Sequence, residues 1–385
     1  GICSYVRSKS GYHVYSGTEV TYYPFGERMF EDMMKAIKKA EHFIFIEYFI
    51  IRPGVMWNSM LEVLVQKANE GVEIKIIYDD MGCVALLPPG YFKQLEKLSP
   101  NIKCMAFNPV VPFLSLVMNN RDHRKILVVD GHTGFNGGIN LSDEYINVTS
   151  PYGTWKDTGV RLRGDAVINL TEMFMEMWHT FRDTDAKVDM EKYSPSLYGP
   201  EYHSDGFIQP FYDSPLDDET ISANVYADIV NCAQDYVYIF TPYLILDDTM
   251  KNALCLAAKR GVDVRIVTPG IPDKKLIYRL TRANYKPLLK AGVRIYEYTP
   301  GFIHAKSFVS DDKIGVVGTI NLDYRSLFLH FECGTLMYGS SAVESLKKDH
   351  ITTMDQSREI TLDNIRDYYH GTMFDALLRV IAPLL

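Results

Sequence analysis

Histidine, lysine and aspartate occur twice at one spacing, H-x-K-x-x-x-x-D, once in each half of the 385-residue chain. The matching residues are His123, Lys125 and Asp130 in "HRKILVVD", and His304, Lys306 and Asp311 in "HAKSFVSD". One match is weak, with a chance rate of roughly a few per cent per chain, but two matches in corresponding places are strong. Histidine can attack or donate a proton near neutral pH, and lysine offsets negative charge. The pairs therefore predict chemistry on a phosphate ester.

An asparagine follows each motif at the same distance. Asn140 in "GGIN" and Asn321 in "GTIN" each lie 17 positions after the motif histidine. Phosphodiester transfer needs a nucleophile, a proton donor for the leaving alkoxide, and hydrogen-bond donors for the non-bridging oxygens. The two amides are candidates for the last task. The alternative is that they are turn-forming residues after glycine.

Other charged residues are candidates for supporting roles. Each histidine needs a partner on its second ring nitrogen, and Asp157 in "WKDTGV" and Glu332 in "HFECG" are the candidates. The alternative is that both are surface carboxylates. Glu47 interrupts the apolar run Phe43–Ile51, where a buried carboxylate needs a partner, so it is a candidate to line the site. Arg121 is expected to be an exposed charge rather than a headgroup ligand.

The motif aspartates are expected to have a structural or long-range role. Ile126–Val129 and Ser307–Val309 are typical of buried strands. Side chains two apart on a strand share a face, so each lysine can address the same pocket as its histidine. Asp130 and Asp311 lie on the opposite face, roughly 16 Å further along an extended strand. We keep them as signature residues of the motif.

The elements that must position these residues recur in order along the chain. Strand, helix and strand are predicted over Phe43–Ile46, Met60–Asn69 and Val72–Tyr78, and again over Tyr236–Phe240, Met250–Lys259 and Val262–Val267. Strands alternating with helices indicate an α/β fold. The similar segments "KANEGVEIKII" and "AAKRGVDVRIV" favour an internal repeat over chance similarity. We predict two similar α/β sandwich halves, related by a pseudo-twofold axis, with the active site between them.

A domain boundary is expected near residue 200. The segment Ala186–Thr220 contains proline, glycine, serine and tyrosine without a clear period, which is typical of a linker or an ordered loop. The predicted domains are residues 1–200, which carry the first motif and the start of the linker, and residues 201–385, which carry the second.

Composition limits the classes of function. A net charge of −8 without a basic run argues against a nucleic-acid partner.

The six cysteines are scattered, with no histidine at metal-ligand spacing. No metal or cofactor is therefore predicted, and reduced cytoplasmic thiols are expected. The most apolar run, Phe43–Ile51, is interrupted by Glu47 and is far shorter than the roughly 20 residues that span a bilayer. The start at Gly1 indicates that an upstream segment has been removed.

At these residues the chain resembles the phospholipase D superfamily, which is defined by paired H-x-K-x-x-x-x-D motifs. From about Tyr22 to "APLL", it resembles the bacterial cardiolipin synthase branch in "YYPFGERMF", "FIFIEYFIIRPG", "GGINLSDEY", "AGVRIYEYTPGFIHAKS" and "GTINLDYRS". The resemblance implies a cofactor-free phosphatidyltransferase that forms a phosphatidyl-histidine. One phosphatidylglycerol donates, a second accepts, glycerol leaves and cardiolipin forms. It also implies that His123 attacks and His304 protonates the leaving alkoxide.

The chain departs from the family pattern at two places. Many members read "WRDTH" where this chain has "WKDTG", and many read asparagine in place of His330. Both places lie beside the expected orienting carboxylates and leave fine specificity open. A phospholipase D hydrolase, a phospholipase D-type nuclease and a non-catalytic scaffold are the alternatives. The intact His–Lys pairs argue against the scaffold, and the negative net charge of the chain argues against the nuclease.

The resemblance implies work at the bacterial cell membrane, with hydrophobic helices upstream of Gly1 and the catalytic part on the cytoplasmic side. Val110–Met118 is expected to be either a lipid-facing loop or a buried strand or turn. Met373–Leu385 has apolar residues at helical spacing, and packing against the second half is favoured over membrane contact. The oligomeric state is left open.

Overall fold

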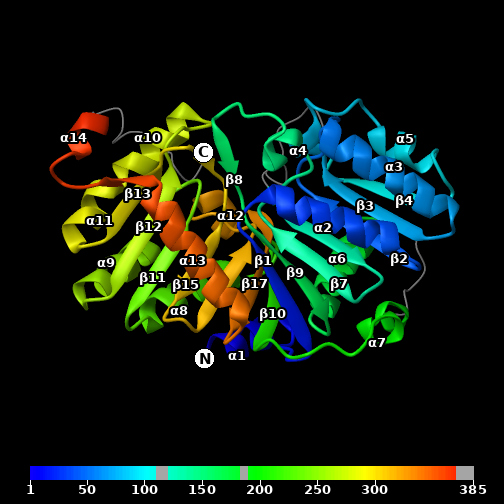
Figure 1. The fold of residues 1–385 in the computed structure, drawn as a ribbon, viewed down its shortest axis with the longest axis horizontal. Helices are drawn as coiled ribbons and strands as arrows, with labels where there is room; N and C mark the ends of the chain where they lie inside the picture. The colour runs from blue at the N-terminus through cyan, green and yellow to red at the C-terminus, as the bar shows by residue number, and fades with distance from the viewer. Residues whose placement is uncertain (110–119, 183–189, 370–385) are drawn as a thin grey trace.

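Two mixed β-sheets form the centre of the molecule, one from each half of the chain (Figure 1). The computed structural model describes residues 1–109, 120–182 and 190–369. The stretches Val110–Met118 and Met373–Leu385, for which lipid contact is one expectation, lie outside the described residues. Among the described residues, no helix has the length and apolar character needed to cross a membrane.

Both sheets have the same strand order. The first runs β1 (Thr18–Tyr23), β9 (Gly159–Gly164), β7 (Thr133–Gly137), β6 (Lys125–Val129), β2 (Phe43–Tyr48), β3 (Glu73–Asp79) and β4 (Ile102–Phe107). The second runs β10 (Phe207–Asp213), β17 (His330–Tyr338), β16 (Ile314–Gly318), β15 (Ser307–Ser310), β11 (Tyr236–Phe240), β12 (Asp263–Pro269), β13 (Arg294–Tyr298) and β18 (Ser357–Ile360). Up to β13, the parallel and antiparallel pairings also match strand for strand. The prediction of two similar α/β halves is confirmed.

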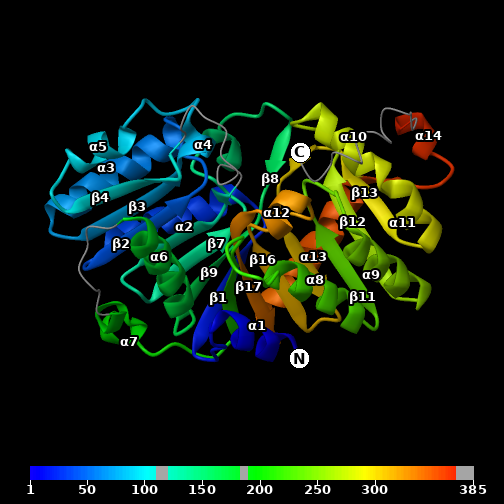
Figure 2. The same cartoon turned by 180° about the vertical axis from the view of Figure 1, so that it is seen from behind.

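Helices cover both faces of each sheet, as the two opposite views show (Figures 1 and 2). In the first half, α2 (Gly26–Lys39) and α3 (Val55–Asn69) lie on one face and α6 (Val167–Phe181) on the other. In the second half, α8 (Ile221–Cys232) and α9 (Asp248–Lys259) lie on one face and α13 (Ser341–Asp355) on the other. Both α6 and α13 also contact the edge strand of the opposite sheet. Their apolar side chains join both sheets in one shared hydrophobic core, which fixes how the halves sit together.

Short elements complete the two halves. The remaining helices are α1 (Ile2–Ser10), α4 (Asp80–Cys83), α5 (Tyr91–Glu96), α7 (Pro195–Tyr198), α10 (Lys275–Ala283), α11 (Tyr285–Ala291), α12 (Tyr324–Phe328) and α14 (Ile365–Tyr368), with 3-10 turns at Asp143–Ile146 and Met190–Tyr193. Three short strands, β5 (Arg121–Asp122), β8 (Thr154–Lys156) and β14 (Gly301–Ile303), pair outside the two main orders.

The segment between the halves differs from the prediction of a linker over Ala186–Thr220. Its described part contains α7 and the strand β10, which pairs with β17 at the edge of the second sheet. The sequence did not indicate this strand because Pro210 lies within it, and proline is tolerated in strands mainly at sheet edges, where β10 lies. The N-terminal helix α1 also differs, since Val6 packs in the core of the second half. The division at residue 200 stays a prediction.

The motif aspartates hold the backbone that leads into a central strand of each sheet. Asp130 accepts hydrogen bonds from the backbone N–H groups of Glu41, His42 and Phe43, and Asp311 from those of Gln234, Asp235 and Tyr236, at 2.8 to 3.0 Å. Both aspartates adopt a positive φ, 49° and 53°. These contacts support a structural role for both aspartates, which stays a prediction.

Replacing either motif aspartate by asparagine should reduce stability more than catalysis. Asp130→Asn and Asp311→Asn exchange a charged acceptor for a neutral amide, at a cost of about 1–3 kcal/mol of folding free energy. The thermal midpoint should therefore fall by a few degrees. Below that midpoint, the folded aspartate variants should have a higher specific activity than the Lys125→Ala variant. Asp218→Asn, at an exposed aspartate, is the matched control. Equal catalytic loss with unchanged midpoints would contradict the structural role.

Candidate active site

Two short strand pairs cross from one half to the other and position the motif histidines. The strand β5 pairs in parallel with the start of β17, and β14 pairs in parallel with β8. His123 follows β5, and its N–H donates to the Phe331 carbonyl at 2.9 Å. His304 follows β14, and its N–H donates to the Lys156 carbonyl at 2.7 Å. Each histidine therefore lies against the backbone of the opposite half.

The same register brings a carboxylate of the opposite half to each histidine. Both oxygens of Glu332 lie close to Nδ1 of His123, at 2.9 and 3.0 Å. Oδ2 of Asp157 lies 2.7 Å from Nδ1 of His304. Both carboxylates are fully buried, so neither is a surface group. A proton on Nδ1 that is donated to a carboxylate leaves Nε2 of each ring for chemistry on a substrate.

A buried lysine lies beside each histidine. Nζ of Lys125 donates to the backbone carbonyl of His123, and Nζ of Lys306 donates to that of His304. Burial lowers the pKa of Lys125 to about 8 and the pKa of Lys306 to about 7. A phosphate anion beside these groups would favour their charged form, because opposite charges raise the pKa of an amine.

The two histidine–carboxylate pairs differ in their charge balance. Burial raises the pKa of Glu332 well above its usual range. Burial also acts to raise the pKa of Asp157, but its charge interaction and hydrogen bond with His304 outweigh that effect and leave the pKa lowered. Burial first, and then nearby lysine charge, lower the pKa of His123 well below its usual range and that of His304 to about 4. Asp157 opposes the shift at His304, so an ionised carboxylate favours a proton on that histidine.

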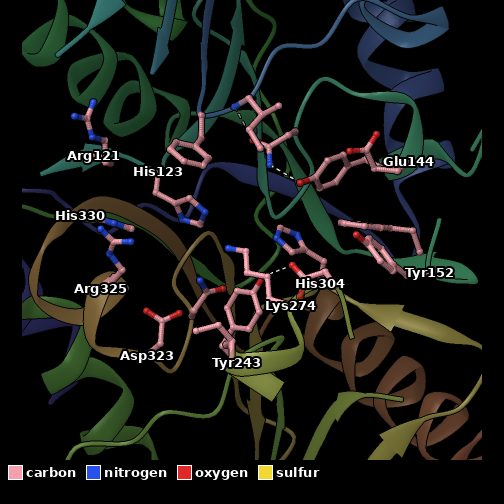
Figure 3. A pocket seen from close by; sticks show the side chains of 18 of the residues that line it. Arg121, His123, Glu144, Tyr152, Tyr243, Lys274, His304, Asp323, Arg325 and His330 are labelled. Carbon is pink, nitrogen blue, oxygen red and sulfur yellow. Dashed lines mark hydrogen bonds between the residues drawn. The ribbon is translucent and has the colours of Figure 1, made fainter. Parts of the chain in front are cut away.

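Both histidines line one cavity of about 920 Å³, built from residues of both halves (Figure 3). Asn140 and Asn321 line it as well. The Oδ1 of Asn140 accepts from the Ile50 N–H at 3.1 Å, and its Nδ2 donates to the Tyr145 hydroxyl at 2.8 Å. The cavity therefore joins two histidines and two side-chain amides, with the buried lysines next to them. This set can bind and attack a phosphodiester.

Two expectations about charged residues are wrong. Glu47 is fully buried on β2, pairs with Arg124 at 2.6 Å, and is not among the residues that line the cavity. Arg121 is only 3% exposed and does line the cavity, with Nη1 3.6 Å from Asp79. Glu47 is buried beside a partner as a carboxylate in an apolar run must be, but that partner is Arg124 and not the cavity. Arg121 was misjudged because the pairing of β5 with β17 could not be predicted from local sequence.

Two polar side chains near the histidines were not predicted: Asn136, which joins the two halves, and Thr319, which contacts Glu332 within the second half. The Nδ2 of Asn136 donates to the Lys125 carbonyl at 3.1 Å, and its Oδ1 accepts from the Thr335 hydroxyl at 3.2 Å. The hydroxyl of Thr319 donates to Glu332. The sequence signal for Thr319 was its place in "GTIN", two residues before Asn321. No comparable signal marks Asn136.

His123, His330 and Glu332 form a cluster that the sequence did not predict, with possible metal-ligand atoms within 4.8 Å of one another. However, His123 and Glu332 already bond to each other, and the charge of Lys125 acts on both histidines. A cation would have to break that bond against the charge of the lysine. The cluster is better explained as an oriented histidine with a second imidazole beside it.

Known proteins of one family match this chain. Residues 33–178 and 226–351 match a family model described as cardiolipin synthase, PLD-like domain. An uncharacterized protein of Streptococcus mutans is 49% identical over 100% of this chain and 82% of its own length. The cardiolipin synthase of Alkalihalophilus pseudofirmus is 34% identical over 94% of this chain and 71% of its own length. The solved phosphatidylserine synthase of Haemophilus influenzae shares the fold, with a TM-score of 0.69, 14% identity, and coverage of 95% of this chain and 93% of its own.

The rate of phosphodiester transfer should fall on the alkaline side of neutrality. The pKa values of Lys306 and Lys125 are lowered to about 7 and about 8, so rising pH removes their positive charge within that window. The value of kcat/KM, which reports the free enzyme, should decline as pH rises through it. Lys306→Arg, if folded by its thermal midpoint, should shift the decline upward, because arginine keeps its charge. A flat profile up to about pH 9 would contradict this assignment.

Proposed function

The chain belongs to the cardiolipin synthase family of the phospholipase D superfamily, and on this premise we propose that it joins two molecules of phosphatidylglycerol into cardiolipin and glycerol. The observation that carries the proposal is the pair of histidines in one cavity, each bonded to a buried carboxylate of the opposite half. Two histidines suit a reaction in two steps, because one can hold the covalent intermediate while the other moves the proton.

In the proposed first step, Nε2 of His123 attacks the phosphorus of the donor lipid. A P–N bond forms, the P–O bond to the headgroup glycerol breaks, and His304 gives its proton to the leaving alkoxide. In the second step, a glycerol hydroxyl of the acceptor lipid attacks the phosphorus. His304 takes the hydroxyl proton, a P–O bond forms, and the P–N bond breaks. Both histidines return to their starting states.

The difference between the two pairs supports this division of roles. A nucleophile must be neutral, and the pKa of His123 is held well below its usual range by burial. A general acid must hold a proton when it acts. The pKa of His304 is lowered as well, to about 4, but Asp157 keeps a negative charge next to it and opposes that shift, whereas the main causes of the shift at His123 all lower its pKa. Lys125, Lys306 and the amides of Asn140 and Asn321 would offset or bind the charge on the phosphate oxygens.

The proposed substrate also places the reaction at a membrane. The acyl chains of phosphatidylglycerol remain in the bilayer, so its headgroup must reach the cavity at a bacterial membrane surface. A cytoplasmic position for the catalytic part and an anchor upstream of Gly1 belong to the same proposal.

Product analysis on phosphatidylglycerol vesicles tests the function. The wild-type chain should release glycerol and form cardiolipin, whereas a hydrolase would form phosphatidic acid with the same glycerol. His123→Ala should reduce the rate on the order of a thousandfold or more, because the nucleophile is lost. His203→Ala, at an exposed histidine, is the matched control. Phosphatidic acid as the main product would overturn the transferase assignment.

The covalent step is tested by trapping the intermediate. Wild-type enzyme quenched during turnover should carry an acid-labile phosphatidyl adduct on His123. The adduct should be absent from His123→Ala, and it should form slowly in His304→Ala, because that variant lacks the proton donor for the leaving glycerol. Mass spectrometry of peptides after rapid digestion locates the adduct. An adduct on His304 in the wild type would reverse the two roles.

A further inference from the structure

The two ends of the active-site cavity differ in chemistry (Figure 3). Arg121, His330 and Arg325 gather on the side of His123, whereas Glu144 and Tyr152 lie on the opposite side (Figure 3). Arg121 comes from the first half, and the other two basic residues come from β17 and α12 of the second half. We name these three residues, together with Lys274, the basic end; Lys274 lies between His123 and His304 (Figure 3), and its charge acts on His330.

The side chains of the basic end carry more positive charge than the nearby carboxylates neutralise. Within the described residues, neither Arg325 nor Lys274 has a carboxylate within ion-pair distance, although both line the cavity. Arg121 has Asp79 at 3.6 Å. However, Asp79 already accepts hydrogen bonds from the backbone N–H groups of Gly82 and Asp122, at 2.9 and 3.0 Å. Burial raises the pKa of Asp79 to about 7, which weakens its negative charge near neutral pH.

The acidic residues that line the cavity have other partners. Asp323 caps the start of α12 by accepting from the Ser326 N–H at 2.9 Å, and burial raises its pKa. Asp273 accepts from the Tyr243 hydroxyl at 2.6 Å. Glu144 lies at the opposite end, where it is 3.7 Å from Arg52. Asp323 lies below Arg325 on the same side (Figure 3), and its raised pKa weakens the negative charge that it brings to the basic end.

The lowered pKa of His330 reflects the positive charge around it. Burial is the main cause that lowers its pKa to about 3, and the charges of Arg325, Lys125, Arg121 and Lys274 lower it further. Four cations thus act on one imidazole beside His123. A neutral histidine there can still donate one hydrogen bond, while the arginine and lysine side chains supply charge.

We propose that the basic end is a second anion subsite, which binds the phosphodiester of the acceptor lipid while its glycerol hydroxyl attacks the phosphatidyl-histidine. The proposal rests on the transferase function above. In the product, one glycerol joins the two phosphates, so the acceptor phosphate must lie one glycerol length from the reacting phosphorus. The basic end borders His123, the proposed carrier of that phosphorus. A singly charged phosphodiester matches its excess of positive charge.

This subsite separates acceptors by charge. Water and a short neutral alcohol have no phosphate, so they gain nothing from Arg325 when they attack the intermediate. Phosphatidylglycerol gains a charge-assisted contact and is held with its hydroxyl toward the phosphorus. The bound lipid acceptor would thus attack the phosphatidyl-histidine faster than water does. The formation of that intermediate would be the same in both reactions.

An acceptor competition tests the subsite. Neutral phosphatidylcholine vesicles with a small fraction of phosphatidylglycerol are incubated with ethanol, and cardiolipin and phosphatidylethanol are measured together. Arg325→Gln should lower cardiolipin formation by about tenfold without lowering phosphatidylethanol formation, because both products come from the same intermediate. Lys274→Gln, at an exposed position that tolerates substitution better, should shift the product ratio in the same direction. Lys275→Gln, at the exposed neighbour outside the cavity, should keep the wild-type ratio.

The outcomes separate this proposal from the function itself. An equal fall of both products in the Arg325 and Lys274 variants would place their charge at the donor lipid and overturn the acceptor subsite. An unchanged product ratio in both variants would overturn it as well. A wild-type chain that forms phosphatidylethanol but no cardiolipin would instead refute the proposed transferase function.

Discussion

The bonds between each motif histidine and a carboxylate of the opposite half are the constraint on which the rest of the structure depends. His123 is held by Glu332 and His304 by Asp157, so neither half contains an oriented histidine by itself. The register for these contacts comes from two strand pairs of only two and three residues. Such short ladders cannot hold two large sheets alone. The shared hydrophobic core, helped by the buried bonds of Asn136, must therefore keep the halves in place.

Buried charge at this centre is satisfied only in part by the protein. Burial lowers the pKa of both motif lysines and raises that of Glu332, so the free enzyme disfavours the charged forms of these groups. A bound phosphodiester supplies the missing negative charge and favours the two ammonium groups. Desolvated cations that are poorly offset before binding interact strongly with an anion, because little water competes with it. Binding of the substrate anion thus offsets the free-energy cost of burying the charged lysines.

Local patterns in the sequence predicted what local interactions determine. One strand–helix–strand unit in each half and the two motif strands were predicted from side-chain periodicity, and the doubled spacing of His123 and His304 indicated the candidate site. Long-range pairing determines the rest. Arg121 reaches the cavity because a two-residue strand pairs with β17, more than 200 positions away. Glu47 lies on a strand whose residues are all buried, so alternation could not show which face it occupies. His330 became visible as a site residue only through the same pairing.

A symmetric scaffold performs an asymmetric reaction, and the asymmetry lies in residues outside the repeated motif. The strand order and the motif contacts are equal in the two halves, so the backbone gives the two histidines equivalent positions. The second carboxylate differs in type, glutamate beside His123 and aspartate beside His304, and only the aspartate has a lowered pKa. Arg121, Arg325 and His330 lie on the His123 side as well (Figure 3). In the proposed mechanism, both differences would separate the histidine that carries the phosphatidyl group from the one that moves the proton, because charge at one end would orient an anionic acceptor toward a single phosphorus atom.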